Sequence, residues 1–553
     1  MLLSPAPLPG TLAAMDALAD LIEDLHHRAH RAWADGDGSR AGALARLGLR
    51  HDPGHPGLLG VLGAAELQAG RAAEAALLFR RALERASADP AAWHNLGVAL
   101  LGAGHQAQAI VAWQGALARD PARADTVFNL ARAHDEQDHP AQARPWYTRA
   151  ARLGQDGAAF HPLGTLLIRT GEVEAGEQWL RAAVCHDPAH AGATTNLGWL
   201  RRRQGNLDHA LRLHERAVRL TPTLADAHWN RASVLLAQGR YPEGFAEWEW
   251  RTRRPGWPFV DPPVPPWTTQ PLAGRTLLVL AEQGAGDMIQ MARFLPALAA
   301  QGARVVVEAP PGLAGPLAGV SGVAAVVPYG EPETLLAQGA DFQVRAFSLP
   351  QRLGLTAGQL PACTFPYLPC PPPAVLPAAP ASQPGPPPLR VGVCWSGNPA
   401  FVENAVRAAP LAAFAPLATV PGVCLYSLQL GDPARALPGA GLPITDLAPL
   451  LADYGATAAV LMALDLVITT DTSVAHLAGA LGRPGLVLLA AHCDWRWGIQ
   501  GQACAWYPSL TLLRQTRLGD WSGVVAEAAG LMEARARRQE SARRSDTPAP
   551  ACP

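Results

Sequence analysis

A repeat of about 34 residues constrains this chain more than any other feature of its sequence. A pair of residues of the Leu-Gly type recurs at steps of 33 or 34 residues: Leu62-Gly63, Leu96-Gly97, Leu130-Ala131, Leu163-Gly164, Leu197-Gly198 and Arg231-Ala232. Each pair is followed by one turn residue: Gly70, Gly104, Asp138, Gly171, Gly205 or Gly239. One such unit cannot bury its apolar face alone. The period therefore predicts a row of stacked helix pairs over residues 20–252.

The pattern resembles the tetratricopeptide repeat, in which each unit is a helix-turn-helix and successive units form a superhelix. After each turn come a small and then a large residue, as at Ala109 and Trp113. Small residues let two helices approach closely, and large ones fill the groove between repeats. The apolar stripes of these helices are therefore expected to be core. The concave side of such a superhelix would hold a protein or peptide partner.

The position before each Leu-Gly pair does not follow the core pattern. It is occupied in turn by Val61, Asn95, Asn129, Pro162, Asn196 and Asn230. The spacing places these residues in one line along the first helices, and an amide can both donate and accept hydrogen bonds from a peptide backbone. The line resembles the asparagine ladder of O-GlcNAc transferase, which predicts acceptor binding by Asn95, Asn129, Asn196 and Asn230. The alternative is that these asparagines only cap or stabilise the repeats.

Composition excludes several classes of function. The chain has no lysine, so all 45 of its cationic side chains are arginine, against 46 acidic residues. This balance offers no basic footprint for nucleic acid. No apolar run approaches the ~20 residues of a membrane span. The segment 1–19 has no basic region typical of a secretory signal. Eight scattered cysteines without a C-x-x-C pair favour a reducing, cytoplasmic environment.

Proline-rich stretches divide the rest of the chain. Residues 253–271 form a predicted linker whose aromatic side chains pack against another part of the protein, and residues 371–388 form a second linker. Between and after them lie two predicted lobes, 272–370 and 389–530, followed by a polar tail, 531–553, expected to be disordered from Arg535 onward.

Each lobe begins with a buried strand and a turn that carries glycine. In the first lobe, the strand 275–281 leads into Gly284-Ala-Gly286-Asp287, a helical pattern and a second strand at 304–308. In the second, the strand from Arg390 ends at Trp395-Ser-Gly-Asn398, and a strand at 465–469 precedes a helix at 474–481. Strand, turn, helix and strand in this order predict Rossmann-like α/β units. Two such lobes predict a GT-B architecture, with ligands in the cleft at the carboxyl ends of the strands.

The segment from Asp471 to Pro484 is the most specific motif in the second lobe. Thr472 and Ser473 stand where a strand passes into a helix, and free backbone N–H groups there favour an anion such as a pyrophosphate. His476 follows one turn later, and Asp471 could accept hydrogen bonds from a sugar hydroxyl. The alternatives are a structural histidine at 476 and simple helix-capping roles for Asp471 and Asp287.

Together these motifs resemble glycosyltransferase family nine, the ADP-heptose heptosyltransferases and their relatives, and bacterial proteins that fuse such a domain to tetratricopeptide repeats. Shared segments also include Ser427-Leu-Gln429, Asp494-Trp-Arg-Trp497 and Trp506-Tyr-Pro508. The resemblance implies inverting transfer from a nucleotide diphosphate sugar without a metal or other cofactor. It also implies that Asp287 is the base, with donor contacts from Gly284, Gly286, Trp395, Ser396, Gly397, Asn398, Gln429, Asp471, Thr472, Ser473, His476 and Arg483.

One departure from the family pattern and one histidine cluster complete the sequence analysis. Members of this family often supply a lysine to the diphosphate, and Arg407 is the cation in about the right region here. Arginine grips phosphate bidentately but cannot be deprotonated. His26, His27 and His30 stand at helical spacing without further ligands in sequence, which favours a solvated helix face over a metal site.

Three functions remain open on this basis. The favoured one is a glycosyltransferase whose repeats hold a protein acceptor. The second is a transferase acting on a lipid-linked or cell-surface glycan, with the repeats docking partner proteins. The third is a non-catalytic scaffold that carries a degenerate transferase domain.

Overall fold

The computed structural model describes residues 9–545 except 155–156, 357, 359, 361–363, 378–387 and 402. Contacts between Cα atoms divide the chain into two compact units, Met1–Leu197 and Gly198–Pro553. The division falls inside α11 (Ala191–Arg203). The last helices of the predicted repeat region, which ends at residue 252, therefore group with the second unit.

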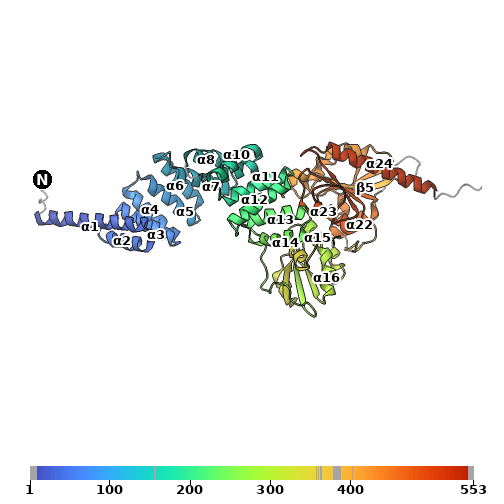
Figure 1. The fold of residues 1–553 in the computed structure, drawn as a ribbon, viewed down its shortest axis with the longest axis horizontal. Helices are drawn as coiled ribbons and strands as arrows, with labels where there is room; N and C mark the ends of the chain where they lie inside the picture. The colour runs from blue at the N-terminus through green and yellow to red at the C-terminus, as the bar shows by residue number, and fades with distance from the viewer. Residues whose placement is uncertain are drawn as a thin grey trace, which may run out of the picture. The chain divides into compact units, whose positions relative to one another are not determined.

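The first unit consists of paired helices, as predicted (Figure 1). Before α11 they are α1 (Pro9–Ala34), α2 (Gly38–Leu49), α3 (Pro56–Gln68), α4 (Ala72–Arg85), α5 (Pro90–Gly102), α6 (Gln106–Arg119), α7 (Ala124–Glu136), α8 (Pro140–Leu153), α9 (Phe160–Arg169) and α10 (Val173–His186). The predicted turn residues have positive φ angles, including Asp138 at 55°, although it carries a side chain. The left-handed conformation ends each first helix and reverses the chain.

Close helix packing explains the small and large residues of the repeat. A Cβ at Gly97 of α5 would overlap the ring of Trp113 on α6, and Trp113 is fully buried. In a later repeat, a Cβ at Gly164 would lie 2.9 Å from both Leu180 and the carbonyl oxygen of Gly176. The small residue is therefore required because a large side chain occupies the space that its own side chain would need.

The second unit joins the last repeat helices to two parallel sheets. Its helices before the sheets are α12 (Leu207–Leu220), α13 (Ala225–Ala237), α14 (Tyr241–Trp248) and the 3₁₀ helix η1 (Glu249–Arg253). The first sheet has the order β3-β2-β1-β4, from β1 (Thr276–Leu280), β2 (Arg304–Ala309), β3 (Val323–Pro328) and β4 (Phe342–Arg345). The second has the order β10-β9-β8-β5-β6-β7, from β5 (Leu389–Cys394), β6 (Val423–Ser427), β7 (Ile444–Asp446), β8 (Leu466–Thr470), β9 (Gly485–Leu489) and β10 (Leu510–Arg514).

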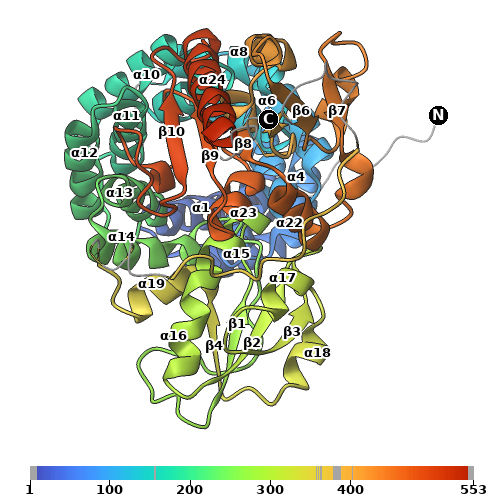
Figure 2. The same cartoon turned by 90° about the vertical axis from the view of Figure 1, so that its right-hand side faces the viewer.

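Helices connect these parallel strands, as the sequence predicts. The first sheet carries α15 (Ala285–Met291), α16 (Leu295–Ala300), α17 (Ala314–Ala318), α18 (Pro332–Leu336) and α19 (Leu349–Arg352). The second carries α20 (Asn404–Arg407), α21 (Ala415–Ala418), α22 (Tyr454–Ala463), α23 (Ser473–Ala480), the 3₁₀ helix η8 (Trp495–Trp497) and α24 (Ser522–Ser545). The predicted strands at 275–281, 304–308 and 465–469 are confirmed as β1, β2 and β8. Between the two sheets, α15 and α23 lie side by side (Figure 2).

The last repeat helices share a hydrophobic core with the sheets. Phe245 of α14 contacts Trp495 edge to face, with ring centroids 5.7 Å apart, and Tyr241 contacts Trp506 at 5.6 Å. Just beyond α14, the fully buried Arg251 donates two hydrogen bonds of 2.8 Å to the carboxylate of Glu282. Aromatic packing and a buried ion pair thus fix α13 and α14 against the α/β part of the unit.

The linkers and the tail agree with the sequence prediction only in part. Trp267 of the first linker is buried, and its backbone N–H donates to the carbonyl oxygen of Gln343 at 2.7 Å, so this linker does pack against the protein. Most of the second linker, residues 378–387, lies outside the described residues. The prediction that the tail is disordered from Arg535 onward was wrong, because α24 continues to Ser545. Only residues 546–553 of that tail lie outside the described part.

Six of the eight cysteines are described, and all six are free thiols: Cys185, Cys370, Cys394, Cys424, Cys493 and Cys504. Cys363 and Cys552 lie outside the described residues. Among the helices that the structure describes, none combines the length and the apolar character that crossing a bilayer requires.

Candidate functional site

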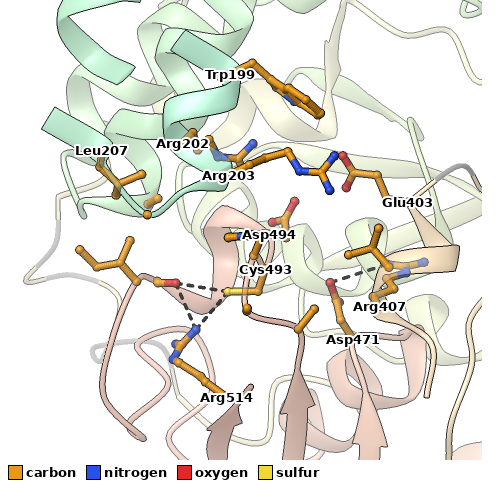
Figure 3. Close-up of a pocket in the computed structure, with 18 residues that line it drawn as sticks. Trp199, Arg202, Arg203, Leu207, Glu403, Arg407, Asp471, Cys493, Asp494 and Arg514 are labelled. Carbon is orange, nitrogen blue, oxygen red and sulfur yellow. Dashed lines mark hydrogen bonds and ion pairs between the residues drawn. The ribbon is translucent and has the colours of Figure 1, made fainter. Parts of the chain in front are cut away.

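A cavity of about 160 Å³, lined by both charged and apolar residues, lies at the carboxyl ends of β8 and β9 in the second unit (Figure 3). Asp471 directly follows β8, and residues 490–494 follow β9. The topology of a parallel sheet brings both segments to this edge, where ligands bind in open α/β folds. Further walls come from the end of α11 and from α20.

Arginines supply the positive charge of the cavity. Arg202 and Arg203, at the end of α11, make no hydrogen bond and no salt bridge with the residues that the structure describes. Arg203 lies over the ring of Trp199, with its guanidinium carbon 4.7 Å from the ring centroid. Arg514, by contrast, donates to the carbonyl oxygen of Trp497. The N–H groups of Arg202 and Arg203 are therefore available to an anion.

Asp471 and Arg407 lie next to each other in the wall of the cavity. The Arg407 Nη1 atom lies 3.7 Å from the Asp471 Oδ2 atom. Burial raises the pKa of Asp471 to about 6, although the nearby Arg407 lowers it. Both predicted residues line the cavity. Asp471 can therefore change its protonation state near neutral pH at the wall of a possible binding site.

Asp287 is linked to the cavity through Arg496 rather than lining it. Arg496 donates to Asp287, to Asp494 at 2.7 Å and to Gln290 at 2.7 Å. The second oxygen of Asp287 accepts the N–H of Gly284 at 2.7 Å, so Asp287 also caps α15, as the alternative reading of the sequence held. Burial raises the pKa of Asp287, while Arg496 opposes the rise. Arg496 thus joins the first sheet's α15 to Asp494, which lines the cavity.

The predicted donor contacts after β5 are held by hydrogen bonds within the protein. The backbone N–H groups of Trp395 and Ser396 donate to Gln429 Oε1 at 3.1 and 2.9 Å. The Gly397 N–H donates to Asn404, while Asn398 accepts the N–H of Ala400. Gln429 therefore braces the turn after β5, and the buried Trp395 packs in the core.

The two hydroxyls at the start of α23 also have partners inside the protein. Thr472 caps the helix by accepting the N–H of Val474 at 3.3 Å. The Ser473 hydroxyl accepts a hydrogen bond from Tyr454 at 3.0 Å. Neither residue lines the cavity. Their placement at the strand-to-helix turn agrees with the sequence prediction, but their side chains stabilise that turn.

His476 is buried on α23, facing α15. Its Nδ1 atom lies 2.8 Å from the hydroxyl of Tyr507, and burial lowers its pKa to about 3, so the ring is neutral at pH 7. A Cβ at Gly286 would lie 2.7 Å from this ring. Gly286 therefore permits the crossing of α15 and α23, and Gly284 supplies the backbone N–H that Asp287 accepts.

Arg483 lies at the amino ends of the strands of the second sheet, opposite the ends that form the cavity. It follows α23, which returns the chain to the start of the next strand, and it donates to the carbonyl oxygen of Leu464 just before β8. Because α23 runs antiparallel to the strands, the residue after it reaches their amino ends. The structure thus does not bring Arg483 to the cavity.

The predicted acceptor asparagines occupy equivalent positions on the first helices of their repeats. Asn95, Asn129 and Asn196 are half-buried in the first unit, and Asn230 is half-buried on α13 of the second. Asn196 donates to His161 and to Thr165 on the preceding α9, at 3.1 and 3.0 Å. The side chains of Asn95 and Asn129 make no hydrogen bond within the described residues. Asn196 thus stabilises its repeat, as the alternative reading held, while Asn95 and Asn129 keep their amides available.

The histidines of α1 have partners that the sequence spacing did not indicate. Glu23 and His26 of α1 meet His55, which caps the start of α3. The His55 Nε2 atom lies 3.3 Å from Glu23 Oε1, and His26 Nδ1 lies 3.6 Å from Glu23 Oε2. The expectation that His26 lacks further ligands was therefore wrong, because His55 reaches it from the next helix pair.

Several cavity residues escaped sequence reasoning. Arg202 and Arg203 belong to a run of three arginines in a repeat helix, and that run was the signal available for them. Asp494 and Arg496 belong to a motif noted only as a family likeness. Nothing in the sequence shows that both segments line the same cavity.

Comparison with known proteins identifies the repeats. The family described as tetratricopeptide repeat matches residues 27–90, 94–158 and 195–256. The chain carries tetratricopeptide repeats. It is also similar to Protein FlbA of Caulobacter vibrioides, with 27% identity over 437 residues, or 72% of this chain and 71% of that protein.

Solved repeat proteins resemble parts of the chain. MamA shares 19% identity at a TM-score of 0.28, over 31% of this chain and 93% of MamA. PilF of Pseudomonas aeruginosa shares 18% at a TM-score of 0.35, over 38% of this chain and 96% of PilF. YrrB, described as a repeat protein with an unusual peptide-binding site, shares 20% at a TM-score of 0.27, over 32% of this chain and 91% of YrrB.

Proposed function

We propose that this protein is a glycosyltransferase that takes a sugar from a nucleotide diphosphate sugar and transfers it to a protein held by the repeats. In this proposal the two parallel sheets are the lobes of a GT-B fold. The observation that carries the proposal is a cavity at the carboxyl ends of β8 and β9, lined in part by Arg202 and Arg203, which make no salt bridge within the described residues.

The donor diphosphate is assigned to this cavity. A diphosphate carries its charge on planar sets of oxygens, which guanidinium groups bind bidentately. Arg202, Arg203 and Arg407 line the same cavity and offer several N–H donors. Since the chain has no lysine, arginine must neutralise the leaving diphosphate. Asp471, beside Arg407, is suited to accept hydrogen bonds from sugar hydroxyls.

Asp287 is the proposed general base. In the inverting reaction, the acceptor oxygen attacks the anomeric carbon, its proton passes to a carboxylate, and the bond to the diphosphate breaks. The raised pKa of Asp287, caused by burial, makes it a stronger base than an exposed aspartate. Arg496 holds this carboxylate in one orientation.

The repeats are assigned to the acceptor. Tetratricopeptide repeats form extended concave surfaces for proteins and peptides. Asn95 and Asn129, with free amides at equivalent positions, are suited to pair with an extended backbone. The alternative of a lipid-linked or cell-surface acceptor has no comparable support among the described residues.

Ligand-induced thermal stabilisation of the full chain tests donor binding. Among ADP-, UDP-, GDP- and CMP-linked sugars, at least one should raise the melting temperature. The double change of Arg202→Ala and Arg203→Ala should weaken its binding at least tenfold. Arg201→Ala, next to them on α11 but outside the cavity, is the matched control and should leave affinity unchanged. If none of these sugars binds, the proposal fails.

Catalysis is tested separately from binding. Asp287→Asn keeps the shape and the contact with Gly284, and should reduce transfer 10²- to 10⁴-fold while donor binding persists. The salt bridge with Arg496 occupies one oxygen of Asp287, the proposed base. It therefore favours one alternative, a non-catalytic scaffold that carries a degenerate transferase domain. Binding without any release of nucleotide diphosphate, across acceptor preparations that include whole-cell protein, would select this alternative.

A further inference from the structure

Glu23, His26 and His55 form a cluster of metal-ligand side chains in the first unit, within which one ligand atom of each lies within 4.8 Å of the others. Glu23 and His26 are three residues apart on α1, so they share one face of the helix. His55 comes from the turn between α2 and α3. The cluster therefore joins the first helix pair to the second.

The packing around His26 holds its ring toward His55. A Cβ at Gly57, in the first turn of α3, would overlap the His26 ring, so glycine leaves the space that this ring occupies. The ring centroids of His26 and His55 lie 5.1 Å apart. His26 is half-buried, and His55 is more deeply buried than Glu23. The two imidazoles are thus brought together by tertiary packing.

The three side chains supply the donor atoms that one class of metal ion prefers. Two imidazole nitrogens and a carboxylate oxygen form a common donor set for zinc and similar transition-metal cations. Around tetrahedral zinc, neighbouring ligand atoms lie about 3.3 Å apart. The distance from His55 Nε2 to Glu23 Oε1, 3.3 Å, has this value, and His26 Nδ1 lies 3.6 Å from the other carboxylate oxygen, Oε2.

We propose that Glu23, His26 and His55 bind one divalent transition-metal cation of the zinc type, with water completing its coordination. The cation fastens α1 to the start of α3.

Metal binding at His55 competes with its role as a helix cap. The His55 Nδ1 atom accepts the N–H of Leu58 at 3.2 Å, while its Nε2 atom faces Glu23. A cation bound at Nε2 takes the lone pair of that nitrogen, so the proton of the coordinated imidazole is on Nδ1. The capping hydrogen bond to Leu58 is then lost, and the Leu58 amide should exchange faster with solvent when metal is bound.

Calorimetric titration of untagged, metal-free full chain with zinc chloride tests the proposal. We expect one saturable site per chain and a rise in melting temperature that a chelator reverses. His26→Ala and Glu23→Gln should each weaken zinc binding at least tenfold. His55→Asn should do the same while keeping a side chain that caps α3.

His27→Ala and His30→Ala are the matched controls, because both residues lie beside His26 on α1 but outside the cluster. Both variants should bind zinc as the native chain does. Circular dichroism verifies that every variant keeps its helices. The absence of a saturable site would overturn the proposal, as would undiminished binding in folded His55→Asn or an equal loss in His27→Ala.

Discussion

At the residue scale, the candidate site is a set of charged groups whose properties follow from burial. Arg496 joins Asp287 to Asp494, two carboxylates from different segments of the chain. Asp471 has a single salt-bridge partner, Arg407, at 3.7 Å within the described residues. This pairing offsets only part of the desolvation of the carboxylate, so burial raises the pKa of Asp471 to about 6.

Asp471→Asn should stabilise the fold most strongly above pH 6. The pKa of Asp471 is about 6 in the folded protein, against an ordinary value of 3.8. Between these pH values the folded state binds the proton and the unfolded state does not, so native stability rises as pH falls through 6. Above pH 6 the native carboxylate costs roughly 3 kcal/mol at most, from ~1.36 kcal/mol per pKa unit.

Denaturant titrations of both proteins from pH 4 to pH 8 measure this difference. The stability gained by Asp471→Asn should shrink toward zero near pH 4, where the native carboxyl is also neutral. Arg407→Met removes a group that lowers this pKa and should move the transition to higher pH. A gain that is the same at every pH would contradict the assignment.

At the element scale, the helices of the repeats are positioned by small residues, several of which are glycine. The sequence predicts the helix pairs, the turns and the small-large pairing, because each of these depends on residues close in the chain or on a regular period. It could not predict the partner of His26, because that contact links α1 to the start of α3 across an intervening helix.

Gly97→Ala and Gly60→Ala should have opposite effects. At Gly97, a Cβ meets the buried ring of Trp113, so we expect a loss of about 1–3 kcal/mol from overpacking. At Gly60, inside α3, no atom lies within 4 Å of an added Cβ, and alanine should stabilise the helix by about 0.5–1 kcal/mol. Urea unfolding followed by circular dichroism compares the two. Equal effects would show that helix propensity alone decides these positions.

At the scale of the whole molecule, the repeats and the α/β region are not separated where the sequence pattern changes. The repeat pattern ends near residue 252, yet α12, α13 and α14 belong to the second compact unit. Phe245 and Trp248 of α14 are buried against Trp495. The end of the solenoid is therefore a structural part of the α/β unit.

A fragment of residues 191–553 should be markedly more stable than a fragment of residues 253–553. The shorter fragment loses α13 and α14 and leaves Glu282 buried without Arg251. Exposure of each large aromatic side chain costs about 1.5–3 kcal/mol, and an unpaired buried charge costs several more. Thermal unfolding and light scattering measure the difference. Equal melting temperatures would show that the α/β region folds without the repeat helices.

The sequence by itself determined the repeat period, the turn residues and part of the α/β region, namely the strands β1, β2, β5 and β8. These features are local or periodic, so neighbouring residues are enough to specify them. It also placed Asp471 at the cavity, because a residue directly after a parallel strand must lie at the strand's carboxyl edge.

Only the tertiary structure decided which distant residues meet. Asp287 and Arg496 are 209 residues apart, and Arg202 and Arg203 reach the cavity from a repeat helix. His26 and His55 come from different helix pairs. The physical reason is the same in each case. Such contacts depend on how buried faces of separate elements pack together, and no short stretch of sequence carries that information.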